Sequence, residues 1–228
     1  MVAASHDATH DRIHYVTGPG PAVVVVIFTV REGALHALLV HRAADPCQDM
    51  WALPGGLLLP EETLDAAASR VLVRETGVAE LFLEQLYTFD AAPAARAASS
   101  VTVSYFALVA AERARLEPRE TWRPAWRRID ALPELAFQNN AIIDYALLRL
   151  RAKLDYTNVV CNLMPEEFSL TELQRVYETI LGRPLDKRNF RRRMVSLDLV
   201  RPTARRAAGG AHRPAQLYRF ASRRPMVF

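Results

Sequence analysis

The stretch Trp51–Val78 carries the residues of this chain that are most suggestive of phosphate chemistry. Hydrolysis of a phosphoanhydride needs a divalent cation such as magnesium, which carboxylates hold by converging from one helix face. Positions 71 and 75 lie one turn apart on such a face, and position 74 lies beside them. Val71 and Arg74 leave Glu75 as the single carboxylate, so we expect this surface to repel magnesium and to attract phosphate.

The spacing in this stretch resembles the Nudix box, in which a glycine, a glutamate and a helix rich in glutamates recur at fixed distances. The positions that match are Gly56, Glu62, Arg70, Glu75, Gly77 and Val78, after a predicted Gly-Gly turn. Where the motif has three glutamates, this chain has Val71, Arg74 and Glu75. An apolar stripe in the same helix is also typical of an ordinary core-facing helix. The pattern therefore indicates a Nudix fold without a catalytic site, hence no enzyme, no catalytic residues and no required metal or cofactor.

Length, composition and cysteine usage limit the class of protein. At 228 residues, half of them apolar, the chain can bury one full core and a second, smaller one. Cys47 and Cys161 lie far apart, outside the spacing of a disulfide framework or a zinc site. No stretch approaches the roughly 18 apolar residues of a membrane span, and no secretion signal is recognisable. We therefore expect a soluble cytoplasmic protein with no membrane contact.

Charge is divided unevenly along the chain. Residues 1–153 contain 15 Lys and Arg against 18 Asp and Glu, whereas residues 154–228 contain 14 against 7. The formal net charge of +4 therefore resides in the C-terminal third. A basic third attached to a mildly acidic body indicates two functions, and a polyanion is the expected partner of the basic one.

Apolar patterns predict the elements of the first part. Strands are predicted at Ala22–Val30, Leu35–His41, Leu83–Phe89 and Val101–Val109, and a helix at Asn139–Leu154. Residues 1–20 have no periodicity and are expected to form a mobile tail. We place the domain boundary near Arg151, which gives one domain at 21–151 and a second at 152–228.

Several features around the box suit contacts to a phosphorylated nucleotide. Arg42 ends the second predicted strand beside a polar loop, where it can contact phosphate, although a solvated surface is the default expectation. Trp122 and Trp126 alternate with arginines, so they either stack on a base or pack at a sheet edge. Asp90–Ser100 is Ala-rich and aperiodic, which makes it a candidate lid. The candidate effector-binding residues are Arg42, Gly56, Glu62, Arg70, Arg74 and Glu75.

The second part begins with a helix, a short turn and another helix. Ser169 and Glu172 form a predicted capping box ahead of an apolar stripe, and Gly182 ends that helix. Asp186 caps the next helix, DKRNFRRRMVSLDLV, which is rich in cations. This arrangement is typical of a helix-turn-helix, whose second helix lies in the major groove of DNA.

A basic hairpin follows the second helix. Val200 begins a strand, Arg201–Arg213 holds four arginines and two glycines, and Gln216–Phe220 returns as a strand. Between residues 187 and 224 the chain has 12 Lys and Arg and a single acid. A charge run is usually a solvated face, but clustering on a helix and a hairpin favours DNA. The candidate DNA-binding residues are Lys187, Arg188, Arg191, Arg192, Arg205, Arg206 and Arg213.

Both parts together resemble the Nudix-related transcriptional regulators of NAD metabolism, which pair a Nudix-like effector domain with a winged helix. The motifs WALPGG, LEQLYTF, LPELAF, LQRVYETILGRPLDKRNFRRRM and HRPAQLYRF carry the resemblance. It implies an α+β fold, with an αβα Nudix sandwich followed by a winged helix, and a homodimer. It also implies repression at a double-stranded DNA operator, relieved by ADP-ribose or a similar phosphorylated effector, in genes of NAD or related nucleotide and sugar metabolism. The same family resemblance adds Asn189 and His212 to the candidate DNA-binding residues.

The residues in which this chain departs from the family bear on the identity of the effector more than on DNA binding. Val71 and Arg74 break the metal site, and Gln138 and Asn139 stand where the family usually has an acid and a histidine. One alternative is a Nudix-type nucleoside-diphosphate-sugar pyrophosphohydrolase with an accessory nucleic-acid-binding domain, which needs carboxylates that the box lacks. Another is an inactive Nudix module that binds RNA, which binding to structured RNA rather than duplex DNA would reveal.

Overall fold

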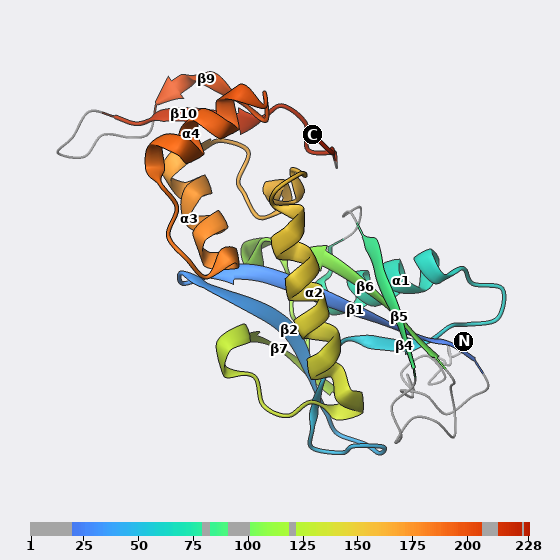
Figure 1. The fold of residues 1–228 in the computed structure, drawn as a ribbon. Coiled ribbons are helices and arrows are strands. Elements are labelled where there is room, and N and C mark those ends of the chain that lie inside the picture. The colour runs from blue at the N-terminus through green and yellow to red at the C-terminus, as the bar shows by residue number, and fades with distance from the viewer. Residues whose placement is uncertain (1–19, 79–82, 91–100, 119–121, 207–213, 225) are drawn as a thin grey trace, which may run out of the picture.

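A computed structural model describes residues 20–78, 83–90, 101–118, 122–206, 214–224 and 226–228. Its N-terminal domain is built on a seven-stranded sheet with the order β3-β2-β1-β6-β5, in which β4 pairs with β1 and β7 with β2 (Figure 1). The strands are β1 (Ala22–Arg31), β2 (Ala34–Arg42), β3 (Trp51–Ala52), β4 (Gly55–Leu57), β5 (Glu84–Asp90), β6 (Val101–Leu108) and β7 (Trp122–Arg128). The helices are α1 (Leu64–Thr76), α2 (Asn139–Lys153) and the short η2 (Ala111–Arg113), η3 (Ile129–Ala131) and η4 (Ala136–Gln138).

Some predicted segments fall on residues that the structure leaves undescribed. They are residues 1–19 of the expected tail, residues 91–100 of the candidate lid and residues 207–213 at the tip of the basic hairpin. Among the described helices, none is both long and apolar enough to cross a lipid bilayer.

Strand β1 lies at the centre of the sheet because it is apolar on both faces. It pairs antiparallel with β2 and parallel with β6. Val23 and Ile27 face the apolar cluster that α1 closes, whereas Val24 and Phe28 face the cluster that α2 closes. This follows from the alternation of side chains along a strand. The predicted αβα sandwich and the four predicted strands are confirmed.

The Gly-Gly dipeptide of the box forms a strand rather than the expected turn, and that prediction is wrong. Gly55 and Gly56 lie in β4 and pair with the first residues of β1. The reason is an open edge, because β1 pairs with β2 only from Phe28 to Arg31. Buried backbone groups need hydrogen-bond partners, and β4 supplies them to the remaining part of that edge.

Helix α1 begins and ends at residues with capping geometry. The Thr63 hydroxyl accepts a hydrogen bond from the Ala66 backbone N–H at 3.2 Å, and Gly77 ends the helix in the left-handed region at φ 67°. The apolar stripe packs against the sheet and includes Val71, which is fully buried. The position where the Nudix motif has a glutamate therefore serves the core.

Helix α2 begins after two residues in the left-handed region, Phe137 at φ 56° and Gln138 at φ 57°. Such backbone angles are uncommon outside glycine. The buried Asn139 side chain accepts a hydrogen bond from the Leu53 backbone N–H at 2.9 Å. Asn139 thus ties the start of α2 to the strand that leads into the box, and the predicted helix is confirmed.

The C-terminal domain contains β8 (Phe168–Ser169), α3 (Leu170–Leu181), α4 (Lys187–Ser196), β9 (Val200–Arg206) and β10 (Gln216–Phe220). Ser169 and Glu172 make both hydrogen bonds of the predicted capping box, and Gly182 ends α3 at φ 70°. The Asp186 carboxylate accepts from the Asn189 N–H at 2.8 Å at the start of α4. The strands form a sheet in the order β8-β10-β9. The helix-turn-helix and both strands of the predicted hairpin are confirmed.

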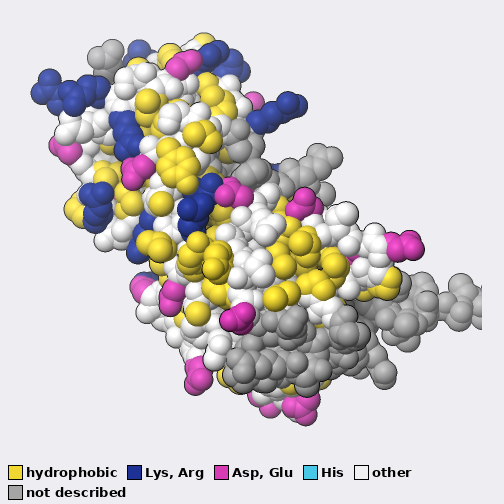
Figure 2. All heavy atoms as spheres, turned by 45° about the vertical axis from the view of Figure 1, so that its right-hand side comes forward, with side chains coloured by type: hydrophobic (Ala, Val, Ile, Leu, Met, Phe, Trp, Pro, Cys, Tyr) yellow, Lys and Arg dark blue, Asp and Glu magenta, His cyan; other side chains and the backbone are white. Residues whose placement is uncertain are grey.

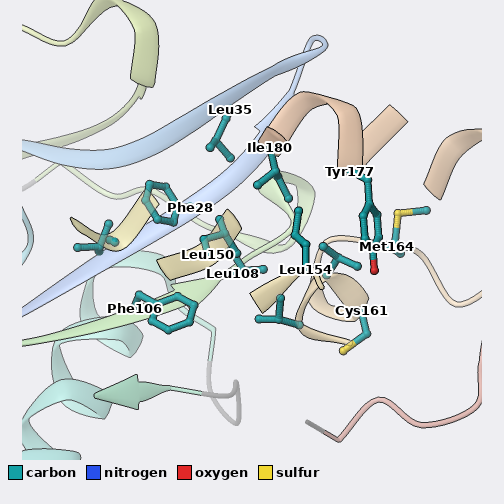
Figure 3. Packing of buried hydrophobic residues seen from close by; sticks show 14 of the residues in the cluster. Phe28, Leu35, Phe106, Leu108, Leu150, Leu154, Cys161, Met164, Tyr177 and Ile180 are labelled. Atoms are coloured by element: carbon teal, nitrogen blue, oxygen red, sulfur yellow. The ribbon is translucent and has the colours of Figure 1, made fainter. Parts of the chain in front are cut away.

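A single apolar cluster runs from the first sheet into the C-terminal domain. Phe28 and Leu35 of the β1–β2 hairpin, Leu150 of α2, and Tyr177 and Ile180 of α3 belong to it (Figure 3). Helix α3 packs against the hairpin and shares the core that α2 covers, so the described buried apolar residues of the C-terminal domain join the larger cluster, and a smaller cluster lies under α1.

The segment between the domains includes the short helix η5 (Val159–Asn162) and is held by residues near the C-terminus. The Asn158 side chain donates to the Ser222 and Arg224 carbonyls, each at 2.9 Å, and accepts from the Met226 N–H at 2.8 Å. A connection with these bonds and without a Gly/Ser-rich stretch transmits a movement instead of absorbing it.

Ile180→Ala tests the shared core. Ile180 is fully buried, and truncating such a side chain to alanine lowers the free energy of unfolding by about 2–5 kcal/mol. The three tryptophans lie between residues 51 and 126, so their fluorescence reports on the N-terminal domain alone. We expect urea denaturation followed by this signal to shift to lower urea. Val195→Ala, at an exposed position of α4, is the control. An unchanged tryptophan transition in Ile180→Ala contradicts a shared core.

Candidate functional sites

An ion pair between Arg70 and Glu62 joins α1 to the loop that precedes it. Arg70 donates from Nε and Nη2 to the two carboxylate oxygens of Glu62, each at 2.7 Å. Its Nη2 also donates to the Leu57 carbonyl at 3.1 Å, and Glu62 accepts from the Leu59 N–H at 3.1 Å. The hydrogen bond from Arg70 is the main cause that holds the pKa of Glu62 below its ordinary value. This bidentate pair fixes the loop between β4 and α1.

The second part of the box contains a buried ion pair. The Arg74 Nε lies 2.6 Å from Glu75 Oε1, and the two side chains are only 9% and 1% exposed. Arg74 also donates to the Gly55 carbonyl at 3.2 Å, and its guanidinium carbon lies 4.4 Å from the centre of the Trp122 ring. A buried charge is strongly unfavourable unless it is paired. The guanidinium therefore neutralises Glu75 from within the protein.

Each arginine of α1 is paired with a carboxylate of its own, despite the four-residue spacing of the two cations. The spacing of Arg70 and Arg74 predicts two like charges that repel each other on one helix face. In the structure each guanidinium is directed to its own carboxylate, which is Glu62 for Arg70 and Glu75 for Arg74. A phosphate that approaches this surface therefore has to compete with those carboxylates.

Arg42 lies inside the protein, although a solvated surface is the default expectation for such a residue. Its Nε donates to the Pro46 carbonyl at 2.8 Å, and its Nη2 donates to the Ala44 carbonyl at 3.3 Å. The guanidinium carbon also lies 5.1 Å from the centre of the Phe137 ring. Arg42 thus holds the loop between β2 and β3, which leads into the box.

The tryptophans of β7 pack within the domain. Trp122 is buried against Arg74, and Trp126 is half-buried against the cluster that α1 closes. Of the two sequence-based interpretations, edge packing describes both residues in this structure. Arg127, directly after Trp126, also stacks internally, since its guanidinium carbon lies 4.2 Å from the centre of the Trp51 ring.

The carboxylates at the matched positions of the box are already engaged by protein groups. Glu75 is engaged with Arg74, and Gly56 is buried in β4. Within the described part of the chain, no three His, Cys, Asp or Glu side chains are grouped so that they hold a metal ion. Magnesium requires oxygen ligands in nearly octahedral geometry, and a carboxylate already neutralised by a guanidinium is a poor one.

Helix α4 presents an apolar face to the core and a polar face to solvent. Phe190 and Met194, four residues apart, are buried and join the shared cluster. The predicted DNA-binding residues of this helix are all exposed, namely Lys187, Arg188, Asn189, Arg191 and Arg192. Figure 2 shows Lys and Arg side chains gathered over the C-terminal domain, in the upper part of the view. The structure therefore places these five residues on one exposed surface.

The described part of the basic hairpin includes two of the candidate DNA-binding cations. Arg205 and Arg206 lie at the end of β9 and are exposed. The Arg205 Nη1 lies 3.2 Å from Glu167 Oε2, although the arginine side chain is 78% exposed. Exposed ion pairs are weak, so Arg205 can exchange Glu167 for a phosphate. The other two candidates, His212 and Arg213, lie outside the described residues.

A groove of about 520 Å³ lies between α3, α4 and β10. It is lined in part by uncharged residues that are further candidates for DNA contacts and that the charge pattern does not reveal. The residues that line it include Thr171, Arg191, Arg192, Gln216 and Tyr218. The Arg191 Nη2 lies 3.4 Å from the Thr171 hydroxyl. The position of Thr171 could have been predicted from the sequence, because the capping box at Ser169 places Thr171 in the first turn of α3. No comparable signal exists for Gln216.

Two protein-family models match the chain. The NUDIX domain model matches residues 18–149, and the model of the NrtR DNA-binding winged helix domain matches residues 160–220. Over 209 residues the chain is 40% identical to the ADPR responsive transcriptional repressor NtrR of Acinetobacter baylyi. That match covers 89% of this chain and 83% of the relative.

The chain is also similar to solved structures of Shewanella oneidensis NrtR. The structure of NrtR complexed with a 27mer DNA is 34% identical with a TM-score of 0.76, and the match covers 87% of this chain and 92% of that one. The NUDIX domain of NrtR complexed with ADP ribose is 29% identical with a TM-score of 0.51, and the match covers 64% and 95%. The likeness thus extends over both domains.

Glu62→Gln tests the pH dependence of the pair with Arg70. A carboxyl whose pKa is lower in the folded state adds stability above its unfolded pKa, and that contribution is lost as the pH falls through the folded pKa. The ordinary value is 4.5 and Arg70 lowers it, so the loss begins below that pH. Between about pH 6 and about pH 3 we expect wild type to lose more free energy of unfolding than Glu62→Gln, as measured by urea denaturation. Glu32→Gln, whose side chain is 80% exposed, is the control. Equal losses in wild type and Glu62→Gln contradict the assignment.

Proposed function

The chain belongs to the NrtR family, which combines a Nudix domain with a DNA-binding winged helix, and we propose that it is a ligand-controlled transcriptional repressor. Residues 21–151 bind the effector and residues 152–228 bind a double-stranded operator. The effector is ADP-ribose or a similar phosphorylated metabolite, and the controlled genes serve NAD or related nucleotide and sugar metabolism. The protein acts in the cytoplasm as a homodimer.

The exposed cations of α4 carry the DNA-binding half of this proposal. Their side chains stand on the helix that corresponds to the recognition helix of a helix-turn-helix, which reads base edges in the major groove. Arginine suits this role because its fork donates to both acceptors of guanine. Arg205 and Arg206 extend the positive surface to the hairpin, where contacts to the phosphate backbone add affinity for any duplex.

The buried pair of Arg74 and Glu75 is the observation that supports effector binding by the Nudix domain. A cation supplied by the protein stands where a metal-dependent hydrolase needs carboxylates, so a diphosphate can bind there and remain intact. Arg70, whose side chain is 28% exposed, offers the guanidinium group that meets phosphate, whereas Arg42 and Arg74 shape the site from inside the protein. The structure of the NUDIX domain of S. oneidensis NrtR complexed with ADP ribose supports a ligand of this chemical class.

Hydrolysis of a nucleoside-diphosphate sugar is the competing function, and the same pair argues against it. Turnover requires a metal that neutralises charge on the reacting phosphates. Val71 is part of the core and Glu75 is paired, so α1 offers no cluster of carboxylates. We therefore propose that the chain is not an enzyme.

We propose a homodimer because one winged helix alone cannot distinguish an operator from the rest of a genome. One winged helix contacts few base pairs, whereas two recognition helices related by a twofold axis read two half-sites about one helical turn apart. Each matched base pair contributes only a modest discrimination, so a second half-site supplies what a genome requires. Sedimentation of a dimer on a roughly palindromic duplex is the expected result.

ADP-ribose is expected to release the protein from its operator, and Arg70→Gln is expected to weaken this response. The measurement is a mobility shift on the DNA upstream of its own gene, titrated with ADP-ribose in the presence of magnesium. Loss of a charge-assisted hydrogen bond of about 1.5–3 kcal/mol should raise the ADP-ribose needed for release by roughly tenfold or more. Binding of ligand-free Arg70→Gln to the operator should match wild type.

The control for this experiment is Arg128→Gln, because Arg128 is an exposed arginine of the same domain that pairs with Asp130. Recovered ADP-ribose should be intact after incubation with magnesium or manganese. If turnover appears and Glu75→Gln abolishes it, the hydrolase is the correct function. If no nucleotide or phosphosugar in a broad panel changes operator affinity, the sensor proposal fails.

Arg192 and Arg205 are expected to contribute to DNA binding in different ways. Arg192→Ala should weaken specific operator binding by about 1–3 kcal/mol, because this residue is placed on the recognition helix to read a guanine. Arg205→Ala should weaken binding to every duplex and flatten the dependence of affinity on salt. Fluorescence anisotropy on operator and random DNA at several salt concentrations separates the two. Equal losses on both duplexes for both variants refute this division.

A further inference from the structure

The last turn of α2 carries cations that contact two different domains. The Lys153 Nζ lies 2.7 Å from Glu84 Oε1, at the first residue of β5. The Arg151 Nε donates to the Ile180 carbonyl at 2.8 Å, near the end of α3. Side chains two positions apart on an α-helix point about 200° apart, so these cations reach in nearly opposite directions. One helical turn therefore holds the first sheet on one side and the helix-turn-helix on the other.

A third contact follows directly after the helix. The Arg193 Nη2 donates to the Asp155 carbonyl at 2.6 Å, and the Arg193 Nη1 lies 3.3 Å from Asp155 Oδ1. Arg193 belongs to α4, whose other cations the proposed function assigns to DNA. The recognition helix is thus attached to the residue just beyond the end of the interdomain helix.

The contact between α2 and β5 is a rigid one. The Lys153 and Glu84 side chains are 10% and 27% exposed, so loss of either leaves its partner poorly solvated and unpaired. Tyr145 of α2 adds aromatic contacts to the same strand, with ring centres 5.2 Å from Tyr87 and 5.9 Å from Phe89. A displacement of β5, which lies at the edge of the sheet, therefore carries α2 with it.

The contact between α2 and α4 is a labile one. The Asp155 and Arg193 side chains are 76% and 43% exposed. Exposed ion pairs of this kind are weak and are screened by salt, so they break and re-form at small free-energy differences. The end of α2 is therefore fixed on the side of β5 and easily changed on the side of α4.

We propose that the end of α2 is the joint through which the effector state of the Nudix domain reaches the recognition helix. Lys153 couples the helix to β5, and Asp155 positions α4 through Arg193. Movement of β5 turns the last turn of α2 and changes the contact between Asp155 and Arg193, which alters the placement of α4 in the dimer. This inference rests on the proposed function of an ADP-ribose-controlled repressor. Because coupling is reciprocal, DNA binding in turn weakens ADP-ribose binding.

The test compares operator affinity with and without saturating ADP-ribose in the full-length protein. The variants are Lys153→Met, which keeps an unbranched side chain of similar length without the charge, and Arg193→Met, which removes both the ion pair with Asp155 and the hydrogen bond to its carbonyl. For wild type we expect a ratio of the two affinities of about 5 to 150. In both variants the ratio should fall toward one. Ligand-free operator affinity, and ADP-ribose affinity measured by calorimetry without DNA, should stay within about twofold of wild type.

Asp130→Ala is the matched control, because Asp130 is an exposed carboxylate that lies 2.6 Å from Arg128 within the Nudix domain. It should keep the wild-type ratio. The double variant Lys153→Met/Glu84→Gln should lose no more coupling than Lys153→Met alone, because both changes remove one contact.

The outcomes separate the joint from the function on which it rests. If Lys153→Met does not fold, Arg193→Met decides the matter, because the Arg193 side chain is 43% exposed and its ion pair contributes little to stability. Unchanged ratios in the folded variants overturn the joint and leave the repressor intact. A wild-type protein that ADP-ribose does not release from DNA overturns both.

Discussion

Three elements of the Nudix domain meet at one buried guanidinium. Arg74 projects from α1, donates to the Gly55 carbonyl of β4 and lies against Trp122 of β7 while it neutralises Glu75. A buried carboxylate has to be paired or lose its charge, and here the preceding residue supplies the cation. The same interaction shapes the chemistry of the domain. The only carboxylate that this helix keeps from the Nudix motif is thus engaged by a guanidinium of the same helix.

Recognition becomes regulation only if the two domains move as a unit, and the packing provides for that. The cluster that α2 closes beneath the first sheet continues through Ile180 into the helix-turn-helix, and Asn158 anchors the connecting segment to residues near the C-terminus. Close-packed interiors change between discrete arrangements and do not deform smoothly. A small change around the ligand site is therefore expected to reappear as a change in the position of α4.

The features that the sequence predicts correctly depend on near neighbours along the chain. The caps at Ser169 and Asp186 involve residues three positions away, and β1 follows from one uninterrupted apolar run. The exposed cations of α4 follow from helical periodicity. By contrast, the carbonyl partners of Arg42, the strand pairing of Gly55 and the shared core depend on residues that only folding brings together. Spacing along the chain does not contain that information. The surroundings of Arg42 and of the box are therefore harder to predict than the exposure of the cations in α4.

The shared core also limits how such a protein can be rearranged by recombination. Ile180 and Tyr177 pack in one cluster with Phe28 and Leu35, so the winged helix is not a self-contained cassette. Cut away from its sensor, it would present an apolar patch to water, and such patches promote association or degradation. A fusion that joins this reader to a different sensor has to reproduce the hairpin surface on which α3 rests. New effector specificities are therefore more accessible through point changes around the Nudix box than through exchange of whole domains.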